Sequence, residues 1–371
     1  MSRVVLVGAG HVHMALLGQA ERLRAAGLVL TLVDPGSFWF GAQPARVMTG
    51  ELGSDALRVS LGRSCRTWDV HRCRDRAIGL DARHRRVWLA GGGKLDYDRV
   101  SLNVGQEIDD SGFDDPAAGV RVWSAASVEQ LSQLHDALAH DCARGARPRV
   151  AIFGDGARAT EIAAGLSMGE FGQRLRLACY LPGPRLLPDA PVTVSRRAAR
   201  VLGMRNVDLL PDTAIVTAID SCVQSRDGRR FPAEHVVLAR GYRAARFVHA
   251  GQMPAEAGGI HVTARLQSPR DERVFASGGC ALLLGRRALE LADVERQARV
   301  LADNLIACAT RRPMKTYRPP ATARAVDLAE GRAFAWYGRL WWYNATAGRW
   351  RSRRDEALRA RLQRAGLADA Y

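Results

Sequence analysis

The fold is decided by residues 3–13, RVVLVGAGHVH. Residues 4–7 form a short apolar run with β-branched side chains, which is typical of a strand buried on both faces. After the glycine turn, residues 14–26 carry apolar side chains at helical spacing, and LVLTLV at residues 28–33 predicts a second strand that ends at Asp34. A strand, a glycine turn, a helix, a second strand and an acid are, in this order, typical of a βαβ unit that binds a dinucleotide.

Each residue of this unit has an expected role. Gly8 makes the tight turn, and Gly10 lets the backbone approach a pyrophosphate at the helix N-terminus. Asp34 is placed to accept hydrogen bonds from a ribose hydroxyl. His13 stands at the third glycine position, and His11 lies beside the predicted phosphates, either as a cofactor contact or as a structural histidine. No residue stands out as an acid–base catalyst, and an ordinary turn without a nucleotide is the alternative interpretation.

A second unit of the same kind starts with RVAIF at residues 149–153 and continues with Gly154 and Gly156. Alanine fills its third glycine position, which is a sterically mild variant. One such unit is typical of a dehydrogenase, whereas two in one chain indicate a flavin together with a nicotinamide nucleotide. The second unit lacks an acid after its next strand, so Arg174 and Arg185 are the candidates to bind a ribose 2′-phosphate.

Length and composition bound the class of protein. The 371 residues are enough for two domains with sizeable cores, and no apolar run is long enough for a transmembrane helix. A strand within three residues of the start leaves no room for a signal peptide. The seven cysteines show no CxxC or zinc spacing, which predicts reduced thiols, no metal site and a cytoplasmic location.

The net charge of +16 indicates an anionic partner surface. Of the 54 basic residues, all except Lys94 and Lys315 are arginine, so a compositional bias accounts for part of this excess. The chain shows no nucleic-acid recognition motif. We therefore expect no nucleic-acid partner and favour membrane lipid, with peripheral attachment to the inner face of the cell membrane.

The C-terminal region carries a second signal of the same kind. Half of the eight tryptophans fall within residues 334–350, and a basic stretch follows at residues 349–364. Aromatic side chains at headgroup level and cations toward anionic lipid are typical of a membrane-facing surface. The alternatives are packing over the first domain with a solvated helix, or a homodimer interface.

The order of these motifs resembles that of the two-dinucleotide-domain flavoproteins, the pyridine nucleotide–disulfide oxidoreductase superfamily, over about residues 3–315. The resemblance implies an FAD site formed by Gly8, Gly10 and Asp34, and two strand-end glycines at the domain crossings, Gly105 and Gly241. It also implies a nicotinamide site framed by Gly154, Gly156 and Glu161. A second FAD motif lies within VFASGG at residues 274–279 and matches at Gly278 and Gly279.

Within the superfamily, the chain is most similar to the branch of type II NADH:quinone oxidoreductases and sulfide:quinone reductases. It also resembles the flavoprotein domain fused to some selenide, water dikinases, which shares the glycine turn followed by His11 and His13. No CxxxxC pair follows Asp34, so the chain lacks the residues of a disulfide-reductase mechanism. Ala292 and Gln297 match the family's quinone-facing helix and are the candidate contacts on the quinone side.

Gly279 departs from the family pattern. Glycine replaces the aspartate that the family uses to hold the ribityl and phosphate region of the flavin. A backbone N–H still binds a pyrophosphate, but the lost charge-assisted hydrogen bond is worth about 1.5–3 kcal/mol. We therefore expect FAD to bind, with reduced affinity.

The resemblance implies an α/β protein with two Rossmann-like domains. We expect an FAD domain at residues 1–115 and 245–315, an NAD(P)-type domain at residues 116–244 and a C-terminal cap at residues 316–371. The implied function is hydride transfer from NAD(P)H through FAD to a quinone or similar small acceptor, without a redox-active disulfide. The alternatives are a flavoenzyme that acts on a small metabolite without NAD(P)H, a sulfur- or selenium-linked oxidoreductase, and a non-catalytic regulatory flavoprotein.

Overall fold

A computed structural model describes most of the chain. The described residues are 1–41, 43–113, 119–240, 242–244, 255–256, 259–283, 286–287, 293–321 and 323–364. Two of the predicted site residues, Gly241 and Ala292, lie outside these ranges, so their roles stay predictions.

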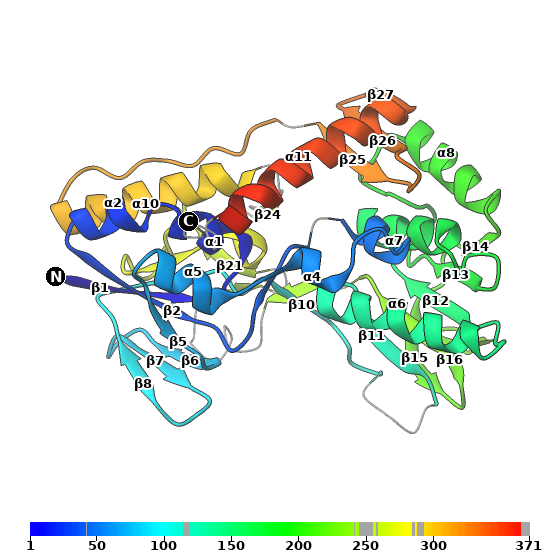
Figure 1. Ribbon diagram of the computed structural model, residues 1–371, viewed down its shortest axis with the longest axis horizontal. Helices are drawn as coiled ribbons and strands as arrows, with labels where there is room; N and C mark the ends of the chain where they lie inside the picture. The colour runs from blue at the N-terminus through cyan, green and yellow to red at the C-terminus, as the bar shows by residue number, and fades with distance from the viewer. Residues whose placement is uncertain are drawn as a thin grey trace.

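Two parallel five-stranded sheets form the framework (Figure 1). In spatial order, the first contains β22 (Val274–Ala276), β9 (Arg99–Leu102), β1 (Ser2–Val7), β2 (Leu28–Val33) and β5 (His71–Cys73). The second contains β11 (Arg121–Ser124), β18 (His235–Leu238), β12 (Arg149–Phe153), β13 (Arg176–Tyr180) and β14 (Val207–Leu210). Both predicted βαβ units are therefore present, and the α/β class with two Rossmann-like domains is confirmed.

Helices cover both sheets, which is why the central strands are apolar on both faces. The first sheet is accompanied by α1 (His11–Leu17), α2 (Ala20–Ala25), α5 (Leu61–Thr67) and α10 (Val294–Thr310). The second is accompanied by α6 (Val128–Ala143), α7 (Ala157–Met168) and α8 (Val192–Gly203). Buried side chains of β1 such as Leu6 and of β12 such as Ile152 belong to one continuous core.

Smaller elements decorate the two sheets. The antiparallel meanders are β6 (Ala77–Asp81), β7 (Arg86–Leu89) and β8 (Lys94–Asp96), and β15 (Ile215–Ile219), β16 (Cys222–Ser225) and β17 (Arg230–Pro232). A four-stranded sheet contains β20 (Ala255–Glu256), β21 (Gly259–Val262), β23 (Ala281–Leu283) and β24 (Arg286–Arg287). The loop after β2 holds β3 (Phe38–Trp39), α3 (Pro44–Met48), α4 (Ser54–Leu57) and β4 (Arg58–Val59).

The chain crosses between the two sheets twice, and the crossings pair with each other. Strand β10 (Gln106–Ile108) runs antiparallel to β19 (Tyr242–Ala244). The strands of the second sheet all lie between these crossings in sequence, so we propose the domain boundaries that the sequence predicts. A further contact joins the halves where α3 packs on α7: a Cβ at Gly165 would lie 2.4 Å from the carbonyl oxygen of Ala45.

The C-terminal segment spans both halves. Its sheet contains β25 (Arg324–Asp327), β26 (Ala333–Tyr337) and β27 (Leu340–Asn344), and β25 contacts α7 of the second half. Helix α11 (Ala345–Arg364) then runs back across the molecule to α1 of the first half, as Figure 1 shows. None of the helices in the described ranges has the length and apolar character needed to cross a bilayer.

Candidate cofactor-binding and redox site

A cleft of about 740 Å³ opens at the carboxyl ends of β1, β2 and β9. Gly8 forms its floor with a φ of +85°, and a Cβ there would lie 2.7 Å from the carbonyl oxygen of Asn103. Both the backbone conformation and the close approach of β9 therefore require glycine. Gly10, His11, Asp34 and Gly105 line the same cleft, so the structure brings together five residues that the sequence predicts for the FAD site.

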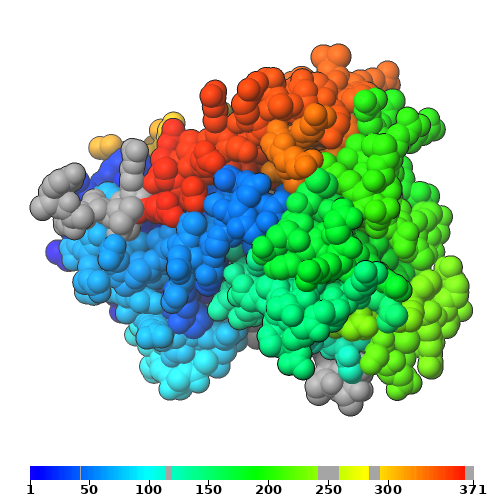
Figure 2. Space-filling view, turned by 45° about the vertical axis from the view of Figure 1, so that its right-hand side comes forward, coloured from blue at the N-terminus to red at the C-terminus, as the bar shows by residue number. Residues whose placement is uncertain are grey.

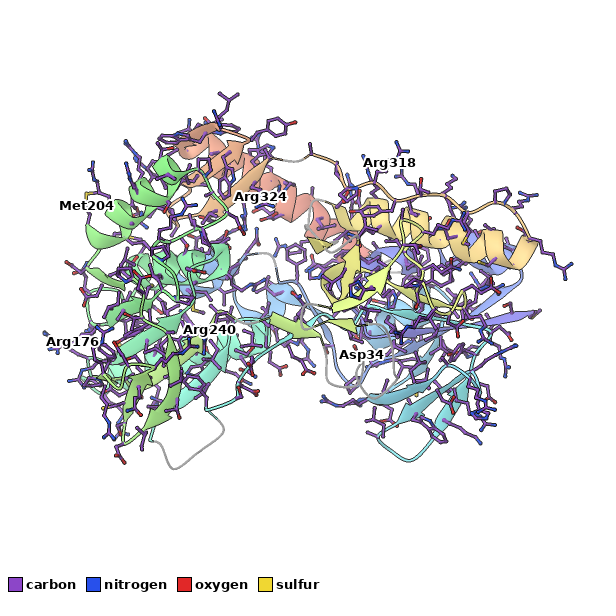
Figure 3. The ribbon with its side chains drawn as sticks, turned by 180° about the vertical axis from the view of Figure 1, so that it is seen from behind. Asp34, Arg176, Met204, Arg240, Arg318 and Arg324 are labelled. Carbon is purple, nitrogen blue, oxygen red and sulfur yellow. The ribbon has the colours of Figure 1, made fainter. Side chains whose placement is uncertain are left out.

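Asp34 sits at the end of β2, facing the cleft (Figure 3). Its Oδ2 accepts the N–H of Ala9 at 2.8 Å, and its Oδ1 accepts the N–H of Gly36 at 2.9 Å. These bonds fix the carboxylate, and each oxygen keeps a lone pair for a further donor. The arrangement suits the ribose contact that the sequence predicts.

Asn103 is a central residue of the site that sequence reasoning missed. Its Oδ1 accepts the N–H groups of Val12 at 3.0 Å and His13 at 3.1 Å, at the N-terminus of α1. Its Nδ2 donates to the carbonyl oxygen of Ser277 at 2.8 Å, at the end of β22. A Cβ at Gly10 would lie 2.3 Å from Asn103 Oδ1, so Gly10 leaves space for this amide. The sequence signal that could have identified Asn103 is a side-chain amide at the end of a predicted strand, two residues before Gly105.

His13 replaces the third glycine with a buried side chain that makes two hydrogen bonds. Its Nδ1 lies 2.7 Å from the carbonyl oxygen of Gly8, and its Nε2 lies 2.8 Å from Ser101 Oγ. Since the carbonyl requires a donor, Nδ1 carries the proton and Nε2 accepts from Ser101. The ring thereby ties α1 to β1 and β9, and burial lowers the pKa of His13 to about 4.

We expect the stability of the protein to fall as the pH drops from 6.5 toward 4, in part because of His13. Folding lowers its pKa from the ordinary value of 6.5 to about 4, so the unfolded chain binds more protons in this interval and stability rises with pH. Chemical denaturation at several pH values should show a shallower pH dependence for His13→Gln. His84→Gln is the matched control, because His84 is exposed; an equal change in both variants would contradict the assignment.

His11 is the first residue of α1 and lines the cleft. Its Nε2 accepts the N–H of Gly41 at 3.4 Å, and its ring packs edge-on against Phe38 with centroids 4.9 Å apart. Burial, together with the charge of Arg158, lowers the pKa of His11 to about 4. The ring is therefore neutral at physiological pH, which fits a polar, uncharged wall of the site better than a proton donor.

Arg158 comes from the second half of the molecule, at the start of α7. Its Nη1 donates to the carbonyl oxygen of Ala125 at 3.0 Å, and its Nη2 donates to that of Gly41 at 2.9 Å. Both partners are neutral carbonyls, so the positive charge remains available to a ligand. Arg158 lines a second pocket of about 160 Å³ together with Gly10, His11, Gly105, Gly278 and Gly279.

The second pocket is where the two FAD motifs meet. Gly278 has a φ of +66°, and a Cβ there would lie 2.3 Å from Asn103 Nδ2. At Gly279, a Cβ would lie 3.4 Å from Cγ and 3.6 Å from Oε1 of Gln106. The amide of Gln106 therefore stands beside the position from which the family's aspartate projects. The sequence offered no local signal for this neighbour.

The second glycine turn has the backbone geometry of its motif. Gly154 has a φ of +139°, and a Cβ there would lie 2.5 Å from the carbonyl oxygen of Ala239, whereas the space beside Gly156 is open. Asp155, between them, has its pKa raised by burial and by the nearby Asp189. Its carbonyl accepts the N–H of Leu187, so residues 181–190 fold over the turn.

The two arginines suggested for a 2′-phosphate differ in position. Arg174 precedes β13 and donates to the carbonyl oxygen of Cys142 at 3.0 Å, at the edge of the sheet away from the glycine turn. The structure therefore does not bring Arg174 to the glycine turn, where the sequence suggested a contact with a 2′-phosphate. Arg185 follows β13 and donates to the carbonyl oxygens of Pro188 and Ala190, within the loop that covers the turn.

Comparison with known proteins agrees with this geometry. The family described as pyridine nucleotide-disulphide oxidoreductase matches residues 2–299. The chain belongs to this family. It is accordingly an FAD-dependent NAD(P)H oxidoreductase.

Individual relatives are distant. The chain is 25% identical over 315 residues to the nitric oxide reductase FlRd-NAD(+) reductase of Pectobacterium atrosepticum, which covers 82% of this chain and 79% of that protein. It is 26% identical over 197 residues to the type II NADH:quinone oxidoreductase of Haemophilus influenzae, covering 48% and 44%. The sulfide:quinone oxidoreductase of Aquifex aeolicus shares the fold, with a TM-score of 0.82 at 16% identity over 100% of this chain and 93% of that one.

Gln297, expected on the quinone side, is buried beneath the second FAD motif. Its Oε1 accepts the N–H of Gly278 at 2.9 Å, and its Nε2 lies 3.5 Å from Tyr317 Oη. The Tyr317 hydroxyl in turn donates to Asp293, and burial raises the pKa of Tyr317. This buried polar chain supports the glycine turn. A contact between Gln297 and an acceptor stays a prediction.

Glu161, expected to frame the nicotinamide nucleotide, faces the C-terminal segment. Its Oε1 lies 2.8 Å from Nη2 of Arg351 in α11 and accepts the N–H of Asp327 at 3.0 Å. Burial raises the pKa of Glu161 to about 7, although the charge of Arg351 opposes this shift. In this arrangement the carboxylate holds the C-terminal segment on α7, and its role toward a nucleotide stays a prediction.

Proposed function

We propose that this oxidoreductase passes hydride from NAD(P)H through FAD to a quinone or similar small acceptor, without a redox-active disulfide. The observation that carries the proposal is the meeting of both FAD motifs and a residue of the second glycine-turn helix around one pocket: Gly10, Gly278 and Arg158 line it together. The similarity to a type II NADH:quinone oxidoreductase supports the choice of acceptor.

The thiols of the described residues support a mechanism without a disulfide. All seven cysteines are free, and the sequence has no CxxxxC pair after Asp34. Cys280, next to Gly279, is buried, and burial raises its pKa to about 11. A thiol with this pKa stays protonated at physiological pH and is a poor nucleophile.

When bound, FAD accepts the hydride and supplies the two-electron chemistry. The residues of the chain would bind and orient it: Gly8 and Gly10 would let the backbone at the N-terminus of α1 approach its phosphates, and Asp34 would hold a ribose. Arg158 places a positive charge in the pocket shared by the two FAD motifs, which favours an electron-rich ligand there. The neutral His11 fills the space between this charge and the aromatic side chain of Phe38.

Anaerobic titration of the purified protein tests the proposal. NADH or NADPH is expected to bleach the flavin band at about 450 nm, and a water-soluble quinone is expected to restore it. Bleaching without recovery would support the dehydrogenase half-reaction and exclude the quinone. A yellow protein that neither nucleotide bleaches would contradict the proposal and favour direct action on a metabolite or a regulatory role.

We also propose that the protein attaches peripherally to membranes through its C-terminal hairpin. At the turn between β26 and β27, Tyr337 is 51% exposed and Leu340 is 73% exposed, with Arg339 between them. Exposed aromatic and aliphatic side chains beside cations are typical of surfaces that enter the headgroup layer.

The Leu340→Glu variant is expected to sediment with anionic vesicles several-fold less than the wild type, because it replaces an apolar contact with the membrane by a charge. Ile219→Glu in β15 is the control, since Ile219 is also exposed and apolar but lies in the meander of β15, β16 and β17, outside the C-terminal hairpin. If the hairpin instead faces a second copy of the chain, the variant would change the mass in solution and leave vesicle binding unaltered.

A further inference from the structure

A second, strongly basic groove lies away from the flavin cleft. It has a volume of about 400 Å³ and separates α8 from the C-terminal segment. Figure 3 shows Met204, which lines it, and Asp34 of the FAD cleft in opposite halves of the molecule. On the surface, the residues of α8 adjoin those of the C-terminal segment (Figure 2). We call this site the α8 groove.

Four arginines and a single glutamate line the α8 groove. Arg205 is held by its partners, because it donates to the carbonyl oxygen of Leu328 and lies 3.6 Å from Glu330. The guanidinium groups of Arg197, Arg200 and Arg332 have no hydrogen bond or ion pair to any residue that the structure describes. The α8 groove therefore carries an uncompensated charge of about +3.

The spacing of arginines in α8 places two of these charges on the same face of the helix. Arg197 and Arg200 are three residues apart in α8, so their side chains leave the same face of the helix. Arg332 approaches from the loop between β25 and β26 on the other side. Like charges at this spacing repel one another and destabilise the helix. A bound anion would remove that repulsion.

The other walls define the shape of such an anion. Tyr343 is held in place by stacking on Phe334, with ring centroids 4.4 Å apart, and presents an aromatic wall. Val201 and Met204 add apolar surface from α8. A volume of about 400 Å³ is at the lower end of the range for small-molecule sites, which leaves room for one phosphate and a short organic group.

We propose that the α8 groove binds the phosphate group of a phosphorylated ligand. Guanidinium groups recognise phosphate through paired, charge-assisted N–H···O bonds, and three of them converge here without an acceptor among the described residues. The phosphate comes either from the headgroup of an anionic phospholipid or from a soluble phosphate ester. The proposal is independent of the flavin reaction.

Binding experiments on the full-length flavoprotein test the proposal in two arms. The soluble arm titrates glycerol 3-phosphate and follows thermal unfolding and heat of binding, with the flavin spectrum recorded to exclude displacement of FAD. The lipid arm measures sedimentation with phosphatidylcholine vesicles, with and without phosphatidic acid. The groove variants are Arg200→Glu and Arg332→Glu. The control is Arg176→Glu in β13, which reverses one exposed charge in the same half of the molecule outside the α8 groove.

Each groove variant is expected to weaken binding about tenfold or more in one arm, whereas Arg176→Glu stays within about twofold of the wild type. A loss in the soluble arm identifies a phosphate ester, and a loss confined to phosphatidic acid vesicles identifies a lipid headgroup. Equal effects of all three variants in both arms, or no binding in either, would overturn the proposal. Flavin bleaching by NAD(P)H should be unchanged in the groove variants, so this test is separate from that of the proposed function.

Discussion

Alanine at position 10 is expected to abolish FAD binding and to destabilise the first half of the molecule. The new Cβ would lie 2.3 Å from Asn103 Oδ1, well inside van der Waals contact. Asn103 has little freedom to move, because its amide holds the N-terminus of α1 and the end of β22. Overpacking costs about 1–3 kcal/mol, and each displaced hydrogen bond adds about 1 kcal/mol. The flavin absorbance per protein and the thermal unfolding of Gly10→Ala measure both effects.

The second glycine turn supplies a matched control. Gly156 holds the same position in its motif, but its φ of −81° suits alanine, and no atom lies within 4 Å of the point that an alanine Cβ would occupy. We expect Gly156→Ala to fold and to retain FAD with wild-type stability, and to raise only the KM for the nucleotide. Equal losses of flavin in the two variants would show that packing around Asn103 is not the cause.

Replacement of Arg351 by methionine is expected to destabilise the docked C-terminal segment by about 3–5 kcal/mol at pH 8. The guanidinium group of Arg351 lies 2.8 Å from Glu161 and 3.1 Å from Asp355, and both carboxylates are buried. Removing the cation leaves two buried acids without their main partner. Thermal unfolding and limited proteolysis within residues 311–321, which follow α10, measure the stability of the segment and its release.

The size of this effect should depend on pH. The pKa of Glu161 is raised from 4.5 to about 7, so the folded protein binds more protons than the unfolded chain between these values, and stability falls as the pH rises through this interval. At pH 6, Glu161 is largely protonated, and the loss of Arg351 should cost less than at pH 8. Arg353→Met is the control, because Arg353 is exposed on the same helix. Equal costs for the two variants, or equal costs at both pH values, would contradict this assignment.

The sequence predicts well what lies within one βαβ unit. Gly8, Gly10 and Asp34 follow from spacing alone, because the turn, the helix and the strand that position them are adjacent in the chain. The position of Gly105 in the same cleft follows from the resemblance to the family and from the strand that precedes it.

Contacts between distant segments could not be predicted from the sequence. Asn103 bonds to residues about 90 positions before it and 174 after it. Glu161 bonds to Asp327, 166 residues later, and to Arg351 beyond it. Periodicity and motif spacing describe only local geometry, so a carboxylate that matches a nucleotide motif and one that anchors a distant helix look alike.

The path of α11 has a mechanical consequence. The two chain crossings, β10 and β19, pair with each other and therefore lie side by side. If these crossings were the only connection, the two halves of the molecule could rotate about them. Helix α11 bridges the halves elsewhere: Arg351 holds Glu161 on one side, while Arg359 and Gln363 donate to the carbonyl oxygen of Ala56 on the other. This third connection, away from the crossings, opposes such a rotation, so we expect substrates to enter an opening that changes little in shape, rather than one that closes around them.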